Sequence, residues 1–123
     1  MNMKKRLLIE MGMGVDQHGQ SPTKAAVKAI KNAIQNVYIT GLIEIFNIRN
    51  LEKIEILAEL GIPYTEMVDI EEVKKAFPIQ GTIKISVKEG GMTIKALKIE
   101  ELNDVSNEVI ICCAAVSVFI DTN

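Results

Sequence analysis

The sequence has 123 residues, a length that suits a single domain (residues 1–123) with a sizeable core. It is 48% hydrophobic but only 4% aromatic, so Ile, Val, Leu, Met and Ala must build that core. The net charge of −2 argues against general nucleic-acid binding, no stretch is apolar enough to span a membrane, and no signal peptide is recognisable, so we expect a cytoplasmic protein.

The first elements expected are a strand and a helix joined by a polar turn. Nearly all residues of Arg6–Met13 are apolar, which predicts a buried strand. Ser21 is a favoured N-cap and Pro22 fits the first helical position, so we predict that a helix begins there. The buried stripe of this helix is expected to comprise Ala26, Ile30, Ala33, Ile34 and Val37.

The middle of the chain predicts further strands and a second helix. Gly41–Ile48 is apolar enough for a strand. Leu51–Pro63 fits an alternating strand and an amphipathic helix about equally well, and the pattern leaves both open. Asp69 and Glu72 form a capping box for a helix that Pro78 should end.

The last third predicts three strands. The alternating runs "GTIKISV" and "MTIKALKI" flank "KEGG", which predicts a β-hairpin. Val109–Ile120 lacks a polar face, which indicates a strand covered on both faces. Cys112 and Cys113 are neighbours whose side chains point to opposite faces, so we expect free thiols. These cysteines and the single His lack the spacing of metal ligands, so we expect no metal site and no cofactor.

The order strand, helix, strand, strand, helix and three strands predicts an α+β two-layer sandwich. Its two helices would pack on one face of a mixed β-sheet. Two helices leave the other face uncovered, and a large exposed apolar face is rare in monomers. We therefore expect a homo-oligomer, either a trimer or a dimer.

The turn between the first strand and the first helix is the candidate functional site. Thr23, Lys24 and the free backbone N–H groups of the helix start could bind a carboxylate or phosphate. His18 could transfer a proton, with Asp16 as the carboxylate that orients it. Lys24 is a third candidate catalytic residue, because it could form a nucleophile pair with Ser21 if it is desolvated. Gln20 lies in the same turn and is a further candidate ligand-binding residue.

Each of these residues has a structural alternative. Asp16 could simply cap a turn, and His18 could be a solvated loop residue. Outside the turn, Glu10 places a charge in an apolar strand, so it should be either paired or functional. Glu89, Gly90 and Gly91 could let a ligand approach the backbone or could form only the hairpin turn.

Several segments together resemble the Lin0512-type conserved hypothetical proteins. These are "RLLIEMGMGVDQHGQSPTKAAVKAIKNAI", "LGIP", "VDIEEVKKAFP", "EGG" and "AAVSVFID". The most specific part, "GVDQHGQSPTKAA", matches the family pattern G-V-D-x-H-G-Q-x-x-T-K-A-A. The matching positions are Gly14, Val15, Asp16, His18, Gly19, Gln20, Thr23, Lys24, Ala25 and Ala26.

The resemblance implies a small bacterial protein and favours a strand for Ile54–Leu60, but it implies no particular activity. A more distant likeness, at the level of fold alone, is to Bacillus-type chorismate mutases, YjgF-like trimers and ring-opening amidohydrolases.

Two functions follow from these expectations. The first is an oligomer that binds a small anionic metabolite at residues 14–24 and catalyses proton transfer or hydrolysis there. The second is a structural or regulatory oligomer without catalysis, in which residues 14–24 form a subunit contact. A solvent-connected pocket at His18 and Lys24 would favour the first function.

Overall fold

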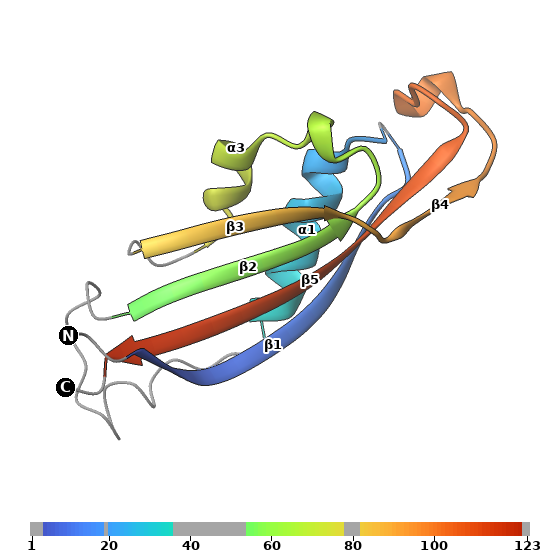
Figure 1. Ribbon diagram of the computed structural model, residues 1–123. Coiled ribbons are helices and arrows are strands. Elements are labelled where there is room, and N and C mark those ends of the chain that lie inside the picture. Colours follow the sequence, from blue (N-terminus) through green and yellow to red (C-terminus); the bar gives the residue numbers. More distant parts are fainter. Residues whose placement is uncertain (1–3, 19, 36–53, 78–81, 122–123) are drawn as a thin grey trace.

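The structure is a computed structural model that describes residues 4–18, 20–35, 54–77 and 82–121 (Figure 1). Its elements are β1 (Lys4–Asp16), α1 (Pro22–Ile34), β2 (Ile54–Ile62), α3 (Ile70–Lys74), β3 (Thr82–Glu89), β4 (Met92–Lys95) and β5 (Glu108–Asp121), with short 3-10 helices at Thr65–Met67 and Glu100–Leu102. The predicted strand Gly41–Ile48, Val37 and Pro78 lie outside the described residues.

The described strands form one mixed sheet, which confirms the predicted α+β sandwich. The sheet order is β1-β5-β2-β3. Strand β5 pairs antiparallel with β1 and β2, whereas β2 and β3 are parallel. Helices α1 and α3 lie on the same face of this sheet, and the opposite face carries no described element (Figure 1).

Helix α1 packs very closely on β1, and two glycines make this possible. A Cβ atom on Gly14 would lie 2.2 Å from the backbone oxygen of Ala25 and 2.3 Å from the nitrogen of Ala29. Gly12 meets Ala33 and Ala29 in the same way. Strand β1 therefore runs past the predicted end at Met13 and reaches Asp16, with both glycines inside it.

The predicted helix starts are confirmed. The Ser21 hydroxyl accepts a hydrogen bond from the Lys24 backbone N–H, with Pro22 at the first helical position. The Asp69 carboxylate accepts from the backbone N–H groups of Glu71 and Glu72. Helix α3 contains only Ile70–Lys74.

Residues Ile54–Leu60 belong to strand β2, so the helical alternative for this segment is wrong. Every second residue of β2 is buried, starting from Ile54 and ending at Ile62, and the residues between them are half-buried. The sheet lies against helix α1 on one side only, and this arrangement produces a period of two.

The predicted hairpin between β3 and β4 is wrong, because these two strands do not pair with each other. Strand β3 pairs with β2, and β4 pairs with the first residues of β5, beyond the end of β2. The chain crosses tightly over that end: a Cβ on Gly90 would lie 3.0 Å from Gly61 Cα. Gly91 has φ +63°, and a Cβ there would lie 2.1 Å from the Ile111 oxygen. The glycine pair thus serves a crossing rather than a two-residue turn.

Strand β5 is covered by a described element on only one of its faces. The alternating residues Ile110 to Ile120 are buried on the helix side. On the other side Cys113 is exposed, and Ile111, Ala115 and Phe119 are half-buried. Cys112 and Cys113 are both free thiols, as expected. Burial raises the pKa of the Cys112 thiol to about 12, which makes it unreactive at neutral pH.

Candidate functional site

Two loops from opposite ends of the chain meet at one end of the sheet. Because β1 and β5 are antiparallel, the end of β1 at Asp16 lies beside the start of β5 at Ile110. Gln20 joins the two loops: its side-chain oxygen accepts from the backbone N–H groups of Val105 (2.8 Å) and Ser106 (3.2 Å). Gln20 is buried although it is polar, so the predicted site residue is held in place by these bonds.

The residue that orients His18 is Asp104, so the prediction that Asp16 performs this role is wrong. His18 Nδ1 lies 2.9 Å from Asp104 Oδ1, although 86 positions separate the two residues. The Asp104 side chain is fully buried, whereas that of His18 is 42% exposed. The pKa of Asp104 is lowered, chiefly by the backbone N–H of Ile99, and His18 and Gln20 also lower it. An ionised carboxylate only accepts, so His18 Nδ1 carries the proton and donates it.

Asp16 binds the start of helix α1 instead. Its carboxylate accepts from the Ser21 backbone N–H at 2.7 Å and from Lys28 Nζ at 3.1 Å. Asp16 is 3% exposed and lies at the end of the helix where the dipole favours negative charge. A carboxylate of the chain itself thus accepts a hydrogen bond from one of the backbone N–H groups beside the predicted anion site.

The other two residues of the predicted anion site have separate surroundings. The Thr23 hydroxyl donates to the Met67 carbonyl oxygen (3.3 Å) and accepts from the Asp69 N–H (2.9 Å), which ties α1 to the segment before α3. Lys24 is exposed, and its ammonium group has no partner among the described residues.

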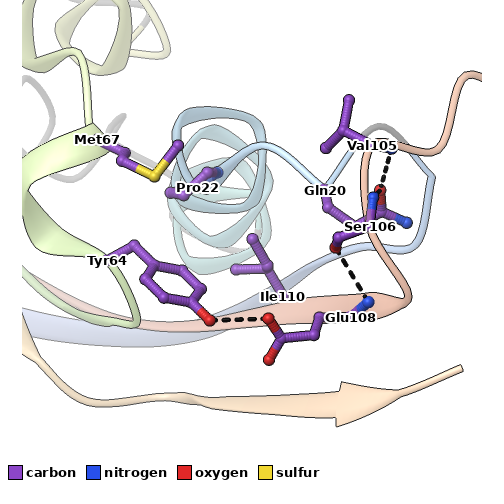
Figure 2. A pocket seen from close by; sticks show the side chains of 8 residues that line it. All are labelled: Gln20, Pro22, Tyr64, Met67, Val105, Ser106, Glu108 and Ile110. Carbon is purple, nitrogen blue, oxygen red and sulfur yellow. Dashed lines mark hydrogen bonds between the residues drawn. The ribbon is translucent and has the colours of Figure 1, made fainter.

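A small cavity lies beside the junction of the two loops (Figure 2). Its volume is about 170 Å³. The lining residues are Gln20, Pro22, Tyr64, Met67, Val105, Ser106, Glu108 and Ile110. Neither His18 nor Lys24 belongs to this set, so the cavity differs from the pocket that the sequence predicted.

The polar wall of the cavity is acidic. The Tyr64 hydroxyl donates to Glu108 Oε1 at 2.8 Å (Figure 2). This bond and the charge of Glu108 raise the pKa of Tyr64, and the charges of Glu89 and Glu66 raise it further. Of these three carboxylates only Glu108 lines the cavity, and the other two act on Tyr64 through their charge.

The backbone is strained around the same junction. Among the described residues other than glycine, only Gln20, Tyr64 and Asn103 have positive φ angles, of 44°, 59° and 64°. Two of them line the cavity and the third precedes Asp104. Residues held in this region are concentrated at functional sites, because the surrounding structure must enforce the conformation.

The remaining predicted residues lie elsewhere. Glu10 is half-buried on β1 and has no partner among the described residues. Glu89 ends β3, and Gly90 and Gly91 form the crossing to β4. Glu89 approaches the site only through its charge on Tyr64.

Sequence reasoning missed Asp104, Tyr64 and Glu108. Asp104 lies in the polar run "EELNDVSNE", which contains several acids and gives no sign of which one is buried. Within the part of the chain that the structure describes, no group of three potential metal ligands occurs. The described helices include none that is long and apolar enough to cross a membrane.

Comparisons with known proteins place the chain in a family. The model of the Lin0512 family of conserved hypothetical proteins matches residues 6–118. The crystal structure of an FtsZ-like protein of unknown function from Nostoc punctiforme is similar, with 41% identity and a TM-score of 0.88. That match covers 99% of this chain and 100% of the Nostoc chain. No curated protein matches. The chain therefore belongs to the Lin0512 family of conserved hypothetical proteins.

Proposed function

We propose that the protein binds a small ligand at the junction of the two loops and that His18, which is paired with Asp104 outside the cavity lining, is a proton-transfer group at the same junction. The observation that carries this proposal is the pairing of a fully buried carboxylate with a half-exposed imidazole across 86 positions of sequence. Burying a carboxylate is costly unless its partners compensate, so such a pair is more typical of a functional site than of a surface loop.

The pair has the geometry of a general base. With Nδ1 donating to Asp104, the neutral ring of His18 presents Nε2 as a free acceptor. Nε2 has no hydrogen-bond partner among the described residues, and the ring is open to solvent. A substrate that reaches this nitrogen can lose a proton to it, while the Asp104 carboxylate stabilises the imidazolium that forms.

The residues that line the cavity support one class of ligand. Glu108 and the acids around Tyr64 favour a positively charged group or a donor of hydrogen bonds, while Pro22, Val105 and Ile110 contact its apolar part. A volume of about 170 Å³ accepts only a few heavy atoms. We therefore propose a small amine as the ligand, rather than the anion that Lys24 and Thr23 suggested.

A thermal-shift comparison of ethanolamine and glycolate tests the ligand class, because the two molecules are similar in size and opposite in charge. At equal ionic strength and pH 7.5, ethanolamine should raise the melting temperature and glycolate should not. A ligand at ten times its Kd adds about 1.4 kcal/mol to the free energy of unfolding, which corresponds to several degrees. The effect should disappear in Glu108→Gln, which keeps the shape of the side chain and removes its charge.

Lys24→Gln serves as the control, because Lys24 belongs to the alternative site for an anion at the helix start. It should leave the response to ethanolamine unchanged. Stabilisation by glycolate that is lost in Lys24→Gln would contradict the proposed amine and would restore the anion site at the helix start.

The tautomer of His18 provides a second test, and His18 is the only histidine in the sequence. At high pH, where the ring is neutral, 15N NMR should show a protonated Nδ1 in the wild-type protein. In Asp104→Ala the proton should move to Nε2, because Nδ1 has lost its acceptor. Glu100→Ala, in the same loop, should leave the tautomer unchanged. A wild-type ring with the proton on Nε2 would rule out the general base.

A non-catalytic role is the second candidate. It is favoured by the bonds of Gln20, which join the two loops, and by those of Asp16 and Thr23, which hold the start of α1 in place. This role is supported if neither probe binds and the substitution His18→Gln changes only the stability of the protein.

A further inference from the structure

The face of the sheet opposite the helices carries a band of exposed apolar side chains. The register places Met11 opposite Ala115, Met13 opposite Cys113, and Met92 opposite Ile111. Residues paired in this way share one face of the sheet. Cys112 and Ala114, which alternate with these residues along β5, are buried on the helix side, so the shared face is the open one. We define the apolar band as Ile9, Met11, Met13, Cys113, Met92 and Ile94.

The exposure of this band is unusual for a monomer. Met11 is 74% exposed, Met13 56%, Met92 54%, and Ile9 and Ile94 are each 47% exposed. Together they run along β1 and β5 and continue onto β4, where the sheet extends away from the helices (Figure 1). Single exposed apolar residues are ordinary, but a contiguous band marks an interaction surface.

On the other half of the same face, formed by β2 and β3, charged side chains pair with one another. Glu55 pairs with Lys84 at 3.1 Å, and Glu59 pairs with Lys88 at 3.9 Å. These ion pairs join β2 to β3, and Glu55 is also paired with Lys4 at 2.7 Å, so both carboxylates already have partners within the chain. Among the described residues, the apolar half of the face is the part whose side chains remain exposed without such partners.

Side chains of α1 block the outer edge of β1 at the level of the band. Asn32 Oδ1 accepts from the Met13 backbone N–H at 3.0 Å, and Lys28 Nζ donates to the Val15 carbonyl oxygen at 3.1 Å. A further strand could not use these backbone groups, so a partner cannot add to this part of the edge. The open face remains as the contact surface.

We propose that a second copy of this chain covers the apolar band. A two-fold axis along the band would place methionine and isoleucine against the same residues of the other copy, with the two charged halves on opposite flanks. Flexible methionine side chains suit such a self-complementary contact.

The area of the face agrees with this occupant. Strands β1, β5, β2 and β3, which follow one another in the sheet, have 13, 14, 9 and 8 residues. With a rise of about 3.3 Å per residue and a strand spacing of about 4.8 Å, the open face of the sheet measures roughly 700 Å². A standard interface buries about 800 Å² per partner.

Sedimentation velocity at micromolar concentration tests the proposal. The wild-type protein should sediment as an oligomer, and Met11→Glu/Met13→Glu should sediment as a folded monomer. Both methionines are exposed within one chain, so the substitution leaves the monomer fold unchanged. Met92→Glu, on another strand, should weaken association in the same direction. Met67→Glu is the control, because this exposed methionine lies away from the band, and it should keep the wild-type mass.

Alkylation of Cys113 gives an independent readout at the band itself. Cys113 is exposed in the single chain and Cys112 is buried, so only Cys113 should react in the folded protein. A second copy should slow this reaction by about tenfold or more relative to Met11→Glu/Met13→Glu, since reaction then requires dissociation. A monomeric wild type would overturn the proposal, whether Cys113 reacts quickly or slowly, and so would a double variant that keeps the wild-type mass.

Discussion

Gly14→Ala is expected to lower the free energy of unfolding by about 3 kcal/mol or more, a large effect for a single methyl group. The added Cβ would lie 2.2 Å from the Ala25 oxygen and 2.3 Å from the Ala29 nitrogen. Both are backbone atoms, so no side-chain rotation relieves the overlap, and α1 must move away from β1. That movement would open contacts of Ala25 and Ala29, which are fully buried.

Gly61→Ala is the matched control, because the same methyl group is added to another strand of the sheet. The nearest atom to its added Cβ, the Gly91 nitrogen, lies at 3.6 Å, an ordinary van der Waals distance. Its effect should stay below about 1 kcal/mol. Urea unfolding followed by circular dichroism measures both variants, at one fixed protein concentration because association adds to stability. Equal losses in the two variants would show that the contact between α1 and β1 yields easily.

The consequences of a displaced α1 extend to the site. Ser21 begins the helix and Gln20 precedes it, so a shift of the helix moves the residue that holds Val105 and Ser106. The glycines of β1 thus set the position of the loop that carries His18. Glycines that lie before a polar turn look like flexible spacers in the sequence, yet here they permit close packing of a rigid helix.

Features that depend on neighbours in the chain were predictable from the sequence. Ser21 and Pro22 specify the start of α1, and Asp69 specifies the start of α3, because each cap bonds to backbone groups two or three residues away. The period of two in Leu51–Pro63 did not by itself exclude a helix, since Leu51, Ile54, Leu57 and Ala58 also have helical spacing and Gly61 could end a helix. Residues Ile54–Ile62 form a strand because they pair with β5 and β3.

Features that depend on distant pairing were not predictable. The glycine pair Gly90 and Gly91 has the same local signature in a hairpin and in a crossing, and only the position of β2 separates the two. The carboxylate beside His18 is another case, since Asp16 is two residues away and Asp104 is 86 positions away. Proximity in the chain suggested Asp16, but the antiparallel pairing of β1 with β5 brings the loop of Asp104 to His18.

Asp16→Ala is expected to lower the free energy of unfolding by about 2 kcal/mol, because it leaves the Ser21 N–H without its acceptor. Asp16 is 3% exposed and also binds Lys28 at 3.1 Å. The substitution therefore removes the acceptor of the Ser21 N–H and the ion pair with Lys28 together. Thermal and urea unfolding measure this loss.

Lys28→Ala separates the two contributions of Asp16. Its side chain is 53% exposed, so its ion pair with Asp16 contributes little, and the loss should stay below about 1 kcal/mol. If Asp16 has only this structural role, Asp16→Ala should leave the 15N tautomer of His18 unchanged, whereas Asp104→Ala should alter it. A stable Asp16→Ala protein with a changed tautomer would instead show that Asp16 acts on His18, as its position in the sequence suggested.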